Sequence, residues 1–435
     1  MVITPLEAWI KDTIGASPAP AAVWTYQRAL VCKTLAWAKE NSIFYANRLR
    51  DIDPWSIHTP HDLARIPTTT PEELRGRDYE FQCLSQGDIA RVVTLASSGT
   101  TGESKRVHFT AEDLNRTVDF FHHGMSTFTM PGNTVLIFMP GQRPGSVGDL
   151  LCTGLEQLGA NGVVHGPVLD PDAALQQMHD LRPQVIVGIP VHVLALAGRD
   201  RSAGGSVHSV LLCSDNVPLS LVETVEKAWS CRVFTHWGMT ETGLGGGVEC
   251  EAREGYHLRE TDLYIETIDP LTGEQLPSGG EGEVVVTTLT RRGMPLIRYR
   301  SGDLAALLTA PCPCGSRLRR LSRIRKRVGE QVELPSGKVF CLAELDEVLF
   351  RVPCLEDYSA QLLPTTPKSV LEIKVRSSPG FGARFLGEAC LAIEKFFSDS
   401  DIPSNELTLN VALDNSGLMA GMAKRRIIGL RGLDA

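Results

Sequence analysis

From about residue 90, the chain alternates between short apolar runs rich in β-branched residues and longer stretches whose apolar residues recur at helical spacing. Alternation of strands and helices at this spacing is typical of a largely parallel sheet covered by helices. We therefore expect an α/β protein whose ligands bind beyond the carboxyl ends of strands. The expected strands are residues 91–96, 133–140, 162–166, 183–190, 206–214 and 231–236.

Two of the expected helices begin with residues that are typical of a helix start. Thr110 is followed three positions later by Asp113, and Ser220 is followed in the same way by Glu223. A hydroxyl three residues before a carboxylate resembles a capping box, in which each side chain accepts a hydrogen bond from the other residue's backbone. The pattern therefore predicts helices that begin at Thr110 and at Ser220.

After residue 260 the pattern changes twice. Residues 263–289 contain strand-like runs broken by Asp-Pro, Thr-Gly and Ser-Gly-Gly, which predicts antiparallel strands joined by tight turns. From about residue 326, expected helices and strands form a small α+β pattern. We expect a large N-terminal domain, residues 1–325, with mostly parallel helix-covered sheets and a β-rich subdomain, followed by a small mobile α+β C-terminal domain, residues 326–435.

The composition limits the functions open to the chain. With 435 residues, 43% of them hydrophobic, it can bury a sizeable core in two or three domains. The formal charge of −8 argues against bulk nucleic-acid binding, and the basic run 317–327 has no interleaved aromatic residues for base stacking. The start of the chain lacks a targeting pattern, and no window reaches the ~18 apolar residues of a membrane span. We expect a cytoplasmic protein with no nucleic-acid or membrane partner.

Residues 97–105, Ser-Ser-Gly-Thr-Thr-Gly-Glu-Ser-Lys, offer almost no apolar side chain for a core. The lysine loop that binds phosphates in many nucleotide-binding proteins is excluded, because Gly99 and Gly102 are too close and Lys105 does not follow a glycine. The dinucleotide fingerprint is excluded because residues 243–248 have the wrong glycine spacing. What remains is a cradle of hydroxyls and amides with one cation, which suits polyphosphate oxygens.

Two further stretches carry groups that suit a nucleotide. Trp237 and the glycine after it offer a flat face for a base, while Thr240 and Glu241 offer a phosphate hydroxyl and a hard oxygen ligand for Mg²⁺. Residues 299–303 place Asp303 in an expected tight turn, where a carboxylate can accept both hydroxyls of a ribose. Each stretch alone also fits an ordinary turn, and it is their order along the chain that favours a nucleotide site.

In this order, the three stretches resemble the motifs of the adenylate-forming (acyl/aryl-CoA ligase) superfamily, and in particular its compact phenylacetate-CoA ligase branch. Residues 97–105 are similar to its phosphate loop, 235–241 to its aromatic-Gly-x-Thr-Glu element, and 299–303 to its Arg-Thr/Ser-Gly-Asp element. The resemblance covers essentially the whole chain. Trp237 departs from it, because tyrosine is commoner at that position.

The resemblance implies that the protein binds ATP, Mg²⁺ and CoA, and it implies a role for each matched residue. Lys105 would bind the ATP phosphates, Thr240 the α-phosphate, and Glu241 the magnesium ion. The other residues implied in nucleotide or CoA binding are Ser97, Ser98, Gly99, Thr100, Thr101 and Gly102 in the phosphate loop, Trp237 and Gly238 near adenine, Ser214, Asp215 and Asn216 as adenine contacts, Asp303 and Arg323 at the ribose, and Gly329 in the pantetheine tunnel.

In this superfamily a lysine of the C-terminal domain assists adenylation, and the domain rotates away for the second step. Here the corresponding cation is Lys424, which lies in the glycine-rich residues 416–430. Arg425 is the alternative, because the local sequence lacks the usual Gly-Lys pair. A solvated basic tail also fits this segment.

The cysteines and one histidine form a separate pattern. Most of the eleven cysteines lie in apolar runs, so a disulfide scaffold is not expected. Cys312 and Cys314 form a tight knuckle, and Cys250 with His257 could complete four soft ligands. Similar Cys/His sets occur in part of the phenylacetate-CoA ligase branch. With four protein ligands, the expected Zn²⁺ is structural; free thiols are the alternative.

These residues predict an AMP-forming acid–thiol ligase. It would activate a carboxylic acid as acyl-AMP and transfer the acyl group to CoA. Lysine and Mg²⁺ would neutralise the repulsion between the anionic acid and the ATP phosphates. By analogy, residues 139–149, 214–216 and 242–246 would line a pocket for an aromatic or similarly sized monocarboxylic acid. Transfer to an amine or a carrier-protein thiol stays open, as does an idle nucleotide- and zinc-binding module. Relatives commonly form dimers, so a homodimer is possible.

Overall fold

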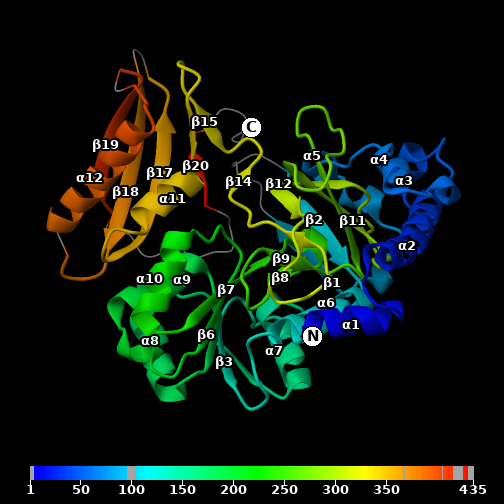
Figure 1. Ribbon diagram of the computed structural model, residues 1–435, viewed down its shortest axis with the longest axis horizontal. Coiled ribbons are helices and arrows are strands. Elements are labelled where there is room, and N and C mark those ends of the chain that lie inside the picture. The colour runs from blue at the N-terminus through cyan, green and yellow to red at the C-terminus, as the bar shows by residue number, and fades with distance from the viewer. Residues whose placement is uncertain are drawn as a thin grey trace. The chain divides into compact units, whose positions relative to one another are not determined.

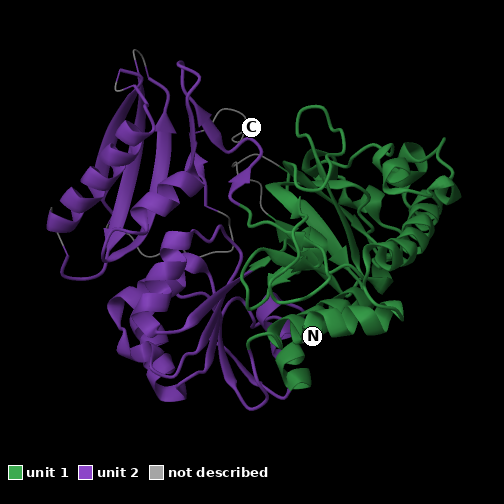
Figure 2. Ribbon diagram, in the orientation of Figure 1, with its two compact units in different colours: residues 1–128, 153–158, 236–324 green, residues 129–152, 159–235, 325–435 purple. Residues whose placement is uncertain are grey.

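The chain folds into two compact units, which Figure 2 colours separately and which are described here one at a time. Figure 1 shows the computed structural model, which describes residues 4–95, 103–365, 368–381, 383–403, 405–414 and 425–429. Within these residues, no helix has both the length and the apolar character needed to span a bilayer. Unit 1 contains residues 1–128, 153–158 and 236–324, and unit 2 contains residues 129–152, 159–235 and 325–435.

Unit 2 contains the predicted parallel sheet, with neighbouring strands in the order β4-β3-β5-β6-β7. Strands β5 and β6 are buried along their whole length, as expected for a sheet covered by helices on both faces. The mixed α/β class is therefore confirmed. The elements are β3 (Thr134–Phe138), α7 (Val147–Leu158), β4 (Asn161–Val164), α8 (Pro171–Leu181), β5 (Val185–Gly188), α9 (Pro190–Arg199), β6 (Ser209–Leu212), α10 (Leu219–Trp229) and β7 (Arg232–Trp237); the last residues of α7 and β7 belong to unit 1.

The first expected strand does not join this parallel sheet. Strand β1 (Arg91–Leu95) instead pairs antiparallel with β2 (Lys105–Phe109) in unit 1. A parallel crossover needs about a dozen residues or more, usually including a helix, and the connection between these strands is shorter. Because the connection is short, the two strands form an antiparallel pair.

One of the two predicted helix starts is confirmed and the other is wrong. At the start of α6 (Ala111–Met125), Thr110 and Asp113 form the predicted capping box. Helix α10 begins earlier than Ser220, and its first amides donate to Glu347 instead, at 2.7 Å from the Leu219 nitrogen and 3.0 Å from the Ser220 nitrogen. A carboxylate far along the chain takes the place of a local cap, which local sequence patterns do not reveal.

Unit 1 contains an antiparallel sheet with the strand order β10-β11-β12-β13-β9-β8. Strands β10 and β11 form the predicted hairpin after residue 260. Asp303 lies inside a ten-residue strand, so the expected tight turn is wrong; the strand is irregular there, since Gly302 has a φ of +77°. The strands are β8 (Gly247–Glu249), β9 (Tyr256–Leu258), β10 (Leu263–Ile268), β11 (Glu281–Thr288), β12 (Tyr299–Leu308) and β13 (Arg320–Leu321).

The N-terminal helices of unit 1 pack around a hydrophobic core that includes Phe81, Phe109 and Tyr299. Three of these helices begin with proline after a threonine, which is a favourable start because proline lacks the amide that a helix would leave unpaired. The helices are α1 (Pro5–Ile14), α2 (Pro20–Asn41), α3 (Ile43–Arg48), α4 (Pro60–Ala64) and α5 (Pro71–Leu74).

After residue 326, unit 2 contains the predicted helices and a mixed sheet with the strand order β19-β18-β17-β20. Helix α12 lies against one face of this sheet (Figure 1). The boundary at residues 325/326 stays a prediction. The elements are β14 (Lys326–Arg327), β15 (Gln331–Glu333), β16 (Val339–Cys341), α11 (Leu342–Leu349), β17 (Leu355–Leu363), β18 (Ser369–Ser377), α12 (Ala383–Asp399), β19 (Leu407–Leu413) and β20 (Ile427–Ile428).

Candidate active site

Three side chains from different parts of unit 1 meet in one buried cluster. Lys105 is the first residue of β2, Glu241 lies in the short turn after β7, and Tyr299 begins β12. The Lys105 ammonium forms an ion pair with Glu241 and donates to the Tyr299 hydroxyl at 3.1 Å. The Tyr299 hydroxyl in turn donates to Glu241 at 2.9 Å. The structure therefore brings together the predicted phosphate-binding lysine and the predicted magnesium ligand.

The charges of this cluster keep Glu241 ionised. Burial alone would raise the pKa of Glu241, but the charge of Lys105 and the hydrogen bonds from Lys105 and Tyr299 hold it below its usual value. Burial, followed by the negative charge of Glu241, raises the pKa of Tyr299 far above its usual range. The cluster therefore presents one carboxylate, one ammonium and one neutral phenol.

Trp237 and Asp303 form a second contact within unit 1. The indole Nε1 of Trp237 donates to Asp303 Oδ2 at 3.0 Å, and both residues are buried. Only 3% of Trp237 is exposed, and the ring packs closely on Gly246, where an added Cβ would lie 2.4 Å from a ring carbon. Both ring and carboxylate are thus engaged within the protein, and their roles in binding a base and a ribose stay predictions.

The backbone after β7 folds back tightly on itself. The Gly246 amide donates to the Trp237 carbonyl at 2.9 Å, and the Leu244 amide donates to Met239 at 3.0 Å. A Cβ added at Gly238 would lie 3.0 Å from Gly245, so glycine is required for this close approach. The turn leaves Thr240 partly accessible and buries Glu241. Its geometry presents the predicted α-phosphate hydroxyl beside the predicted magnesium ligand.

The expected adenine segment lies in unit 2, directly after β6. Ser214 adopts a left-handed backbone conformation with a φ of +79°. The Asp215 carboxylate accepts from the Arg425 amide at 3.3 Å, and Asn216 donates to Asp346 at 3.2 Å. Burial raises the pKa of Asp215 to about 6, and the charge of Arg425 opposes this rise.

Arg425 lies in a socket of acidic and aromatic side chains in unit 2. Its guanidinium donates to Asp346 at 2.8 Å, lies 3.6 Å from Asp357, and packs over the Tyr358 ring at 4.4 Å from the centroid. This cation is engaged by structural partners, which favours Lys424 for the catalytic role. Lys424 lies outside the described residues, as do Ser97, Ser98, Gly99, Thr100, Thr101 and Gly102.

Arg425→Met is expected to lower the free energy of unfolding by about 3–5 kcal/mol, because it leaves Asp346 and Asp357 buried without their cation. Urea or thermal unfolding of the purified variant measures this loss. Arg384→Met is the matched control, since its side chain is 94% exposed and the change should cost less than about 0.5 kcal/mol. Equal losses in the two variants would contradict a structural role for the socket.

The basic run 317–327 is largely paired with acidic side chains. Within unit 1, Arg319 donates to Glu260 at 2.6 Å, and Arg323 donates to the fully buried Glu249 at 2.8 Å. These pairs give the run a structural role, and the absence of a nucleic-acid partner stays a prediction. Gly329 lies in unit 2 with a φ of +78°, a conformation that favours glycine.

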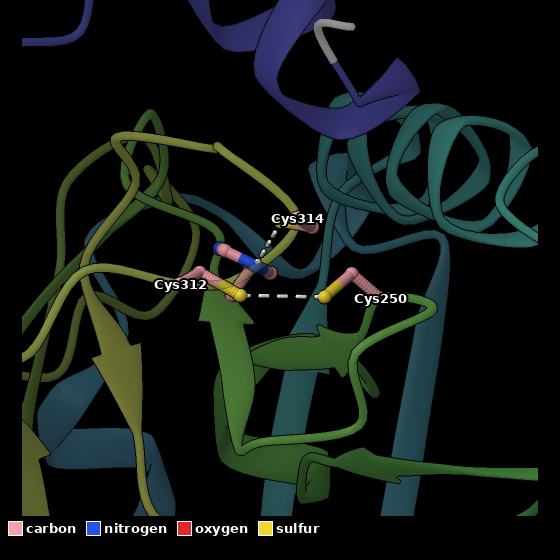
Figure 3. Close-up of side chains that lie close together, drawn as sticks. Cys250, Cys312 and Cys314 are labelled. Carbon is pink, nitrogen blue, oxygen red and sulfur yellow. Dashed lines mark hydrogen bonds between the residues drawn. The ribbon is translucent and has the colours of Figure 1, made fainter.

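The predicted metal ligands lie together in unit 1. Their ligand atoms all lie within 4.8 Å of one another. Figure 3 shows the sulfurs of Cys250 and Cys312 pointing toward each other, and they are 3.5 Å apart. Cys314 Sγ lies 3.4 Å from His257 Nε2. Because Zn–S and Zn–N distances are about 2.3 Å and 2.0 Å, four donors at these separations fit around one zinc ion.

The chemistry of this Cys/His cluster also fits a metal. Burial raises the pKa of Cys314 to about 12, and it lowers the pKa of His257 to about 4. Burial thus favours a neutral Cys314 thiol and a neutral His257 imidazole in this cluster. A bound cation would deprotonate the thiols and satisfy all four donors at once. Cys250 follows β8, His257 lies on β9, and the other two ligands lie between β12 and β13.

Sequence reasoning did not assign roles to two residues near these sites. Tyr299 is the first residue of the stretch 299–303, which the sequence predicts to be a turn. His236 is the last residue of the expected strand 231–236 and directly precedes Trp237 in the second motif. Neither side chain carries a distinctive spacing, so only the fold shows what they contact.

Comparison with solved structures identifies the class of fold. A crystal structure of 2-hydroxyisobutyryl-CoA ligase, in the postadenylation state with R3-HIB-AMP, superimposes with a TM-score of 0.78 at 19% identity. The match covers 96% of this chain and 91% of that one. At this identity the likeness shows a shared fold, which is that of a CoA ligase.

Sequence comparison then gives the family. The family model described as AMP-binding enzyme matches residues 61–290, more than half of the chain. Phenylacetate-coenzyme A ligase of Thermus thermophilus is 30% identical over 383 residues, covering 84% of each chain. Phenylacetate-coenzyme A ligase of Aromatoleum evansii is 29% identical and covers 81% of this chain and 82% of its own. The chain belongs to the AMP-binding enzyme family, as its sequence motifs predicted.

Proposed function

We propose that this protein is an AMP-forming acid–CoA ligase. The observation that carries the proposal is the buried cluster of Lys105, Glu241 and Tyr299, in a chain of the AMP-binding family. The relatives named phenylacetate-coenzyme A ligase support CoA as the acceptor and an aromatic monocarboxylic acid as the substrate. The same strand that begins with Tyr299 carries Asp303, the residue proposed to bind the ribose.

The first step joins the acid to AMP. A carboxylate oxygen attacks the α-phosphorus of ATP, and the bond to the β-phosphate breaks to release pyrophosphate. Both reactants are anions, so Lys105 would leave its ion pair with Glu241 and neutralise phosphate charge. Glu241 is the residue proposed to hold Mg²⁺, which supplies further neutralisation when bound. Thr240 and the loop 97–102 would donate hydrogen bonds to phosphate oxygens.

The second step passes the acyl group to CoA. The thiol sulfur attacks the acyl carbon, the bond to the adenylate oxygen breaks, and AMP leaves with the electron pair. Lys424 is proposed to assist only the first step, as the superfamily resemblance implies. Asp215 and Asn216 would then contact the adenine, while Arg323 and Gly329 would lie beside the ribose and pantetheine.

We also propose that the Cys/His cluster binds one structural Zn²⁺. The support is the close grouping of four soft donors, in which a fourth protein ligand leaves no open position for water. The ion would fix residues 309–319, the connection between β12 and β13, and β12 carries Tyr299 and Asp303. Cytoplasmic location and assembly as a homodimer stay predictions, and light scattering tests the second.

The proposed function is tested by mass spectrometry of the protein incubated with ATP, Mg²⁺ and a panel of aromatic and short-chain acids, with and without CoA. The expected result is an acyl-CoA that requires both ATP and CoA. If acyl adenylate forms without a thioester, the acceptor is an amine or a carrier-protein thiol and not CoA. Absence of both products, together with nucleotide binding, would overturn the ligase assignment in favour of an idle module.

A further inference from the structure

His236 has an unusual environment for a polar side chain. It lies on β7 beside Trp237, and because neighbouring strand residues face opposite sides, the two rings point away from each other. Trp237 contacts Asp303, whereas His236 faces Phe120 of α6, with ring centroids 6.1 Å apart. Among the described residues, His236 Nε2 is buried and has no hydrogen-bond partner.

Glycine backbone closes around this imidazole. A Cβ added at Gly238 would lie 2.8 Å from His236 Cε1, and one added at Gly245 would lie 3.5 Å from Nε2 and 2.4 Å from the Phe120 ring. Any larger residue at these positions would collide with the histidine or with the ring beside it. Glycine backbone therefore encloses a ring whose Nε2 has no hydrogen-bond partner among the described residues.

His236 lies four residues before Thr240, and residues between them are partly accessible. His236, Gly238, Met239 and Thr240 each keep part of their surface accessible, whereas Trp237 and Glu241 on either side are buried. Thr240 is the residue proposed to contact the α-phosphate, to which the acid becomes bonded. An acid joined there would reach the imidazole by extending its body past Gly238 and Met239.

An unpaired imidazole nitrogen in a buried setting is costly. Leaving a buried polar atom without a partner costs about 1–3 kcal/mol, so such atoms in folded proteins usually meet a ligand or water. Burial lowers the pKa of His236 to about 4, so the ring is neutral at pH 7, with one nitrogen donating and the other accepting. A hydroxyl group matches this ring, because it can also donate or accept, whereas a second carboxylate would need a cation.

We propose that His236 is a specificity-determining residue that hydrogen-bonds a hydroxyl group on the acid, and that the substrate is a hydroxylated aromatic monocarboxylic acid. The inference rests on the proposed ligase function and adds the substrate class to it. The Phe120 ring and the glycine backbone supply apolar contact for the aromatic body, and His236 supplies the polar contact that sets its orientation.

The test compares kcat/KM for matched acids that differ only by one hydroxyl: phenylacetate with its 2-, 3- and 4-hydroxy forms, and benzoate with its hydroxy forms. A site built to bond a hydroxyl discriminates strongly against the analogue that lacks it. The wild type should therefore prefer one hydroxylated member over its parent acid by about 10²-fold or more. In His236→Leu, kcat/KM for the hydroxylated acid should fall at least about tenfold further than kcat/KM for the parent.

His236→Gln is the companion variant, because it restores a neutral side chain that can donate and accept. It should recover part of the preference lost in His236→Leu, whereas a purely structural role would make both variants lose activity equally on all acids. Equal kcat/KM for the matched acids in the wild type would overturn the inference and leave the ligase function intact. If no acid yields pyrophosphate, the ligase function itself fails, and this result is distinct from a missing hydroxyl preference.

Discussion

Glu241→Gln is expected to lower the rate of acyl-adenylate formation by about 10²- to 10³-fold, the usual effect of removing one preorganised electrostatic group from an active site. The change keeps the shape of the side chain and removes its charge. It would break the ion pair with Lys105 and remove the proposed magnesium ligand. ATP–pyrophosphate exchange measures the first step directly, with the best acid of the panel as substrate.

Glu266→Gln is the matched control for this variant. Glu266 is also a buried carboxylate of unit 1, but its cation is Arg298, at 2.8 Å, in place of Lys105. It should lower the melting temperature while retaining pyrophosphate exchange in the protein that stays folded. If Glu241→Gln retains exchange within about tenfold of the wild type at saturating Mg²⁺, the role assigned to this carboxylate is wrong.

Most elements of the fold could be predicted because their patterns are local. The buried strands of unit 2 read as continuous apolar runs, and the C-terminal helices and strands alternate clearly. The predictions are wrong where residues far away in the sequence determine the local structure. The cap of α10 comes from Glu347, and the strand through Asp303 is fixed by pairing with β11, which no local pattern contains.

The candidate sites show the same division. The spacing of the cysteines and His257 was enough to predict that they would meet, and the structure brings them together. Motif order predicts that Lys105 and Glu241 belong to one nucleotide site, and the structure pairs them directly. The partners that position these groups could not be predicted. Tyr299 and His236 acquire their surroundings only when strands far apart in the sequence align, since a single aromatic or histidine residue has no spacing to read.

Cys312→Ser is expected to abolish zinc binding and to destabilise unit 1. Serine oxygen is a poor ligand for zinc in this setting, so three donors would remain, and the energy of metal binding that contributes to folding would be lost. We expect a loss of about 3 kcal/mol or more, which corresponds to a fall in melting temperature of roughly 6–12 °C for a unit of this size. Elemental analysis and thermal unfolding, with and without a strong chelator, measure the two effects.

Cys390→Ser separates loss of metal from loss of a thiol. Cys390 is partly buried on α12 in unit 2, outside the Cys/His cluster. This control should keep about one equivalent of zinc, and chelator should destabilise it as much as it destabilises the wild type. Chelator should have little further effect on Cys312→Ser, because that variant has already lost the ion.

Because Cys312 follows the strand that carries Tyr299 and Asp303, Cys312→Ser should also slow pyrophosphate exchange. Wild-type protein with less than about half an equivalent of zinc and no response to chelator would contradict the structural zinc site.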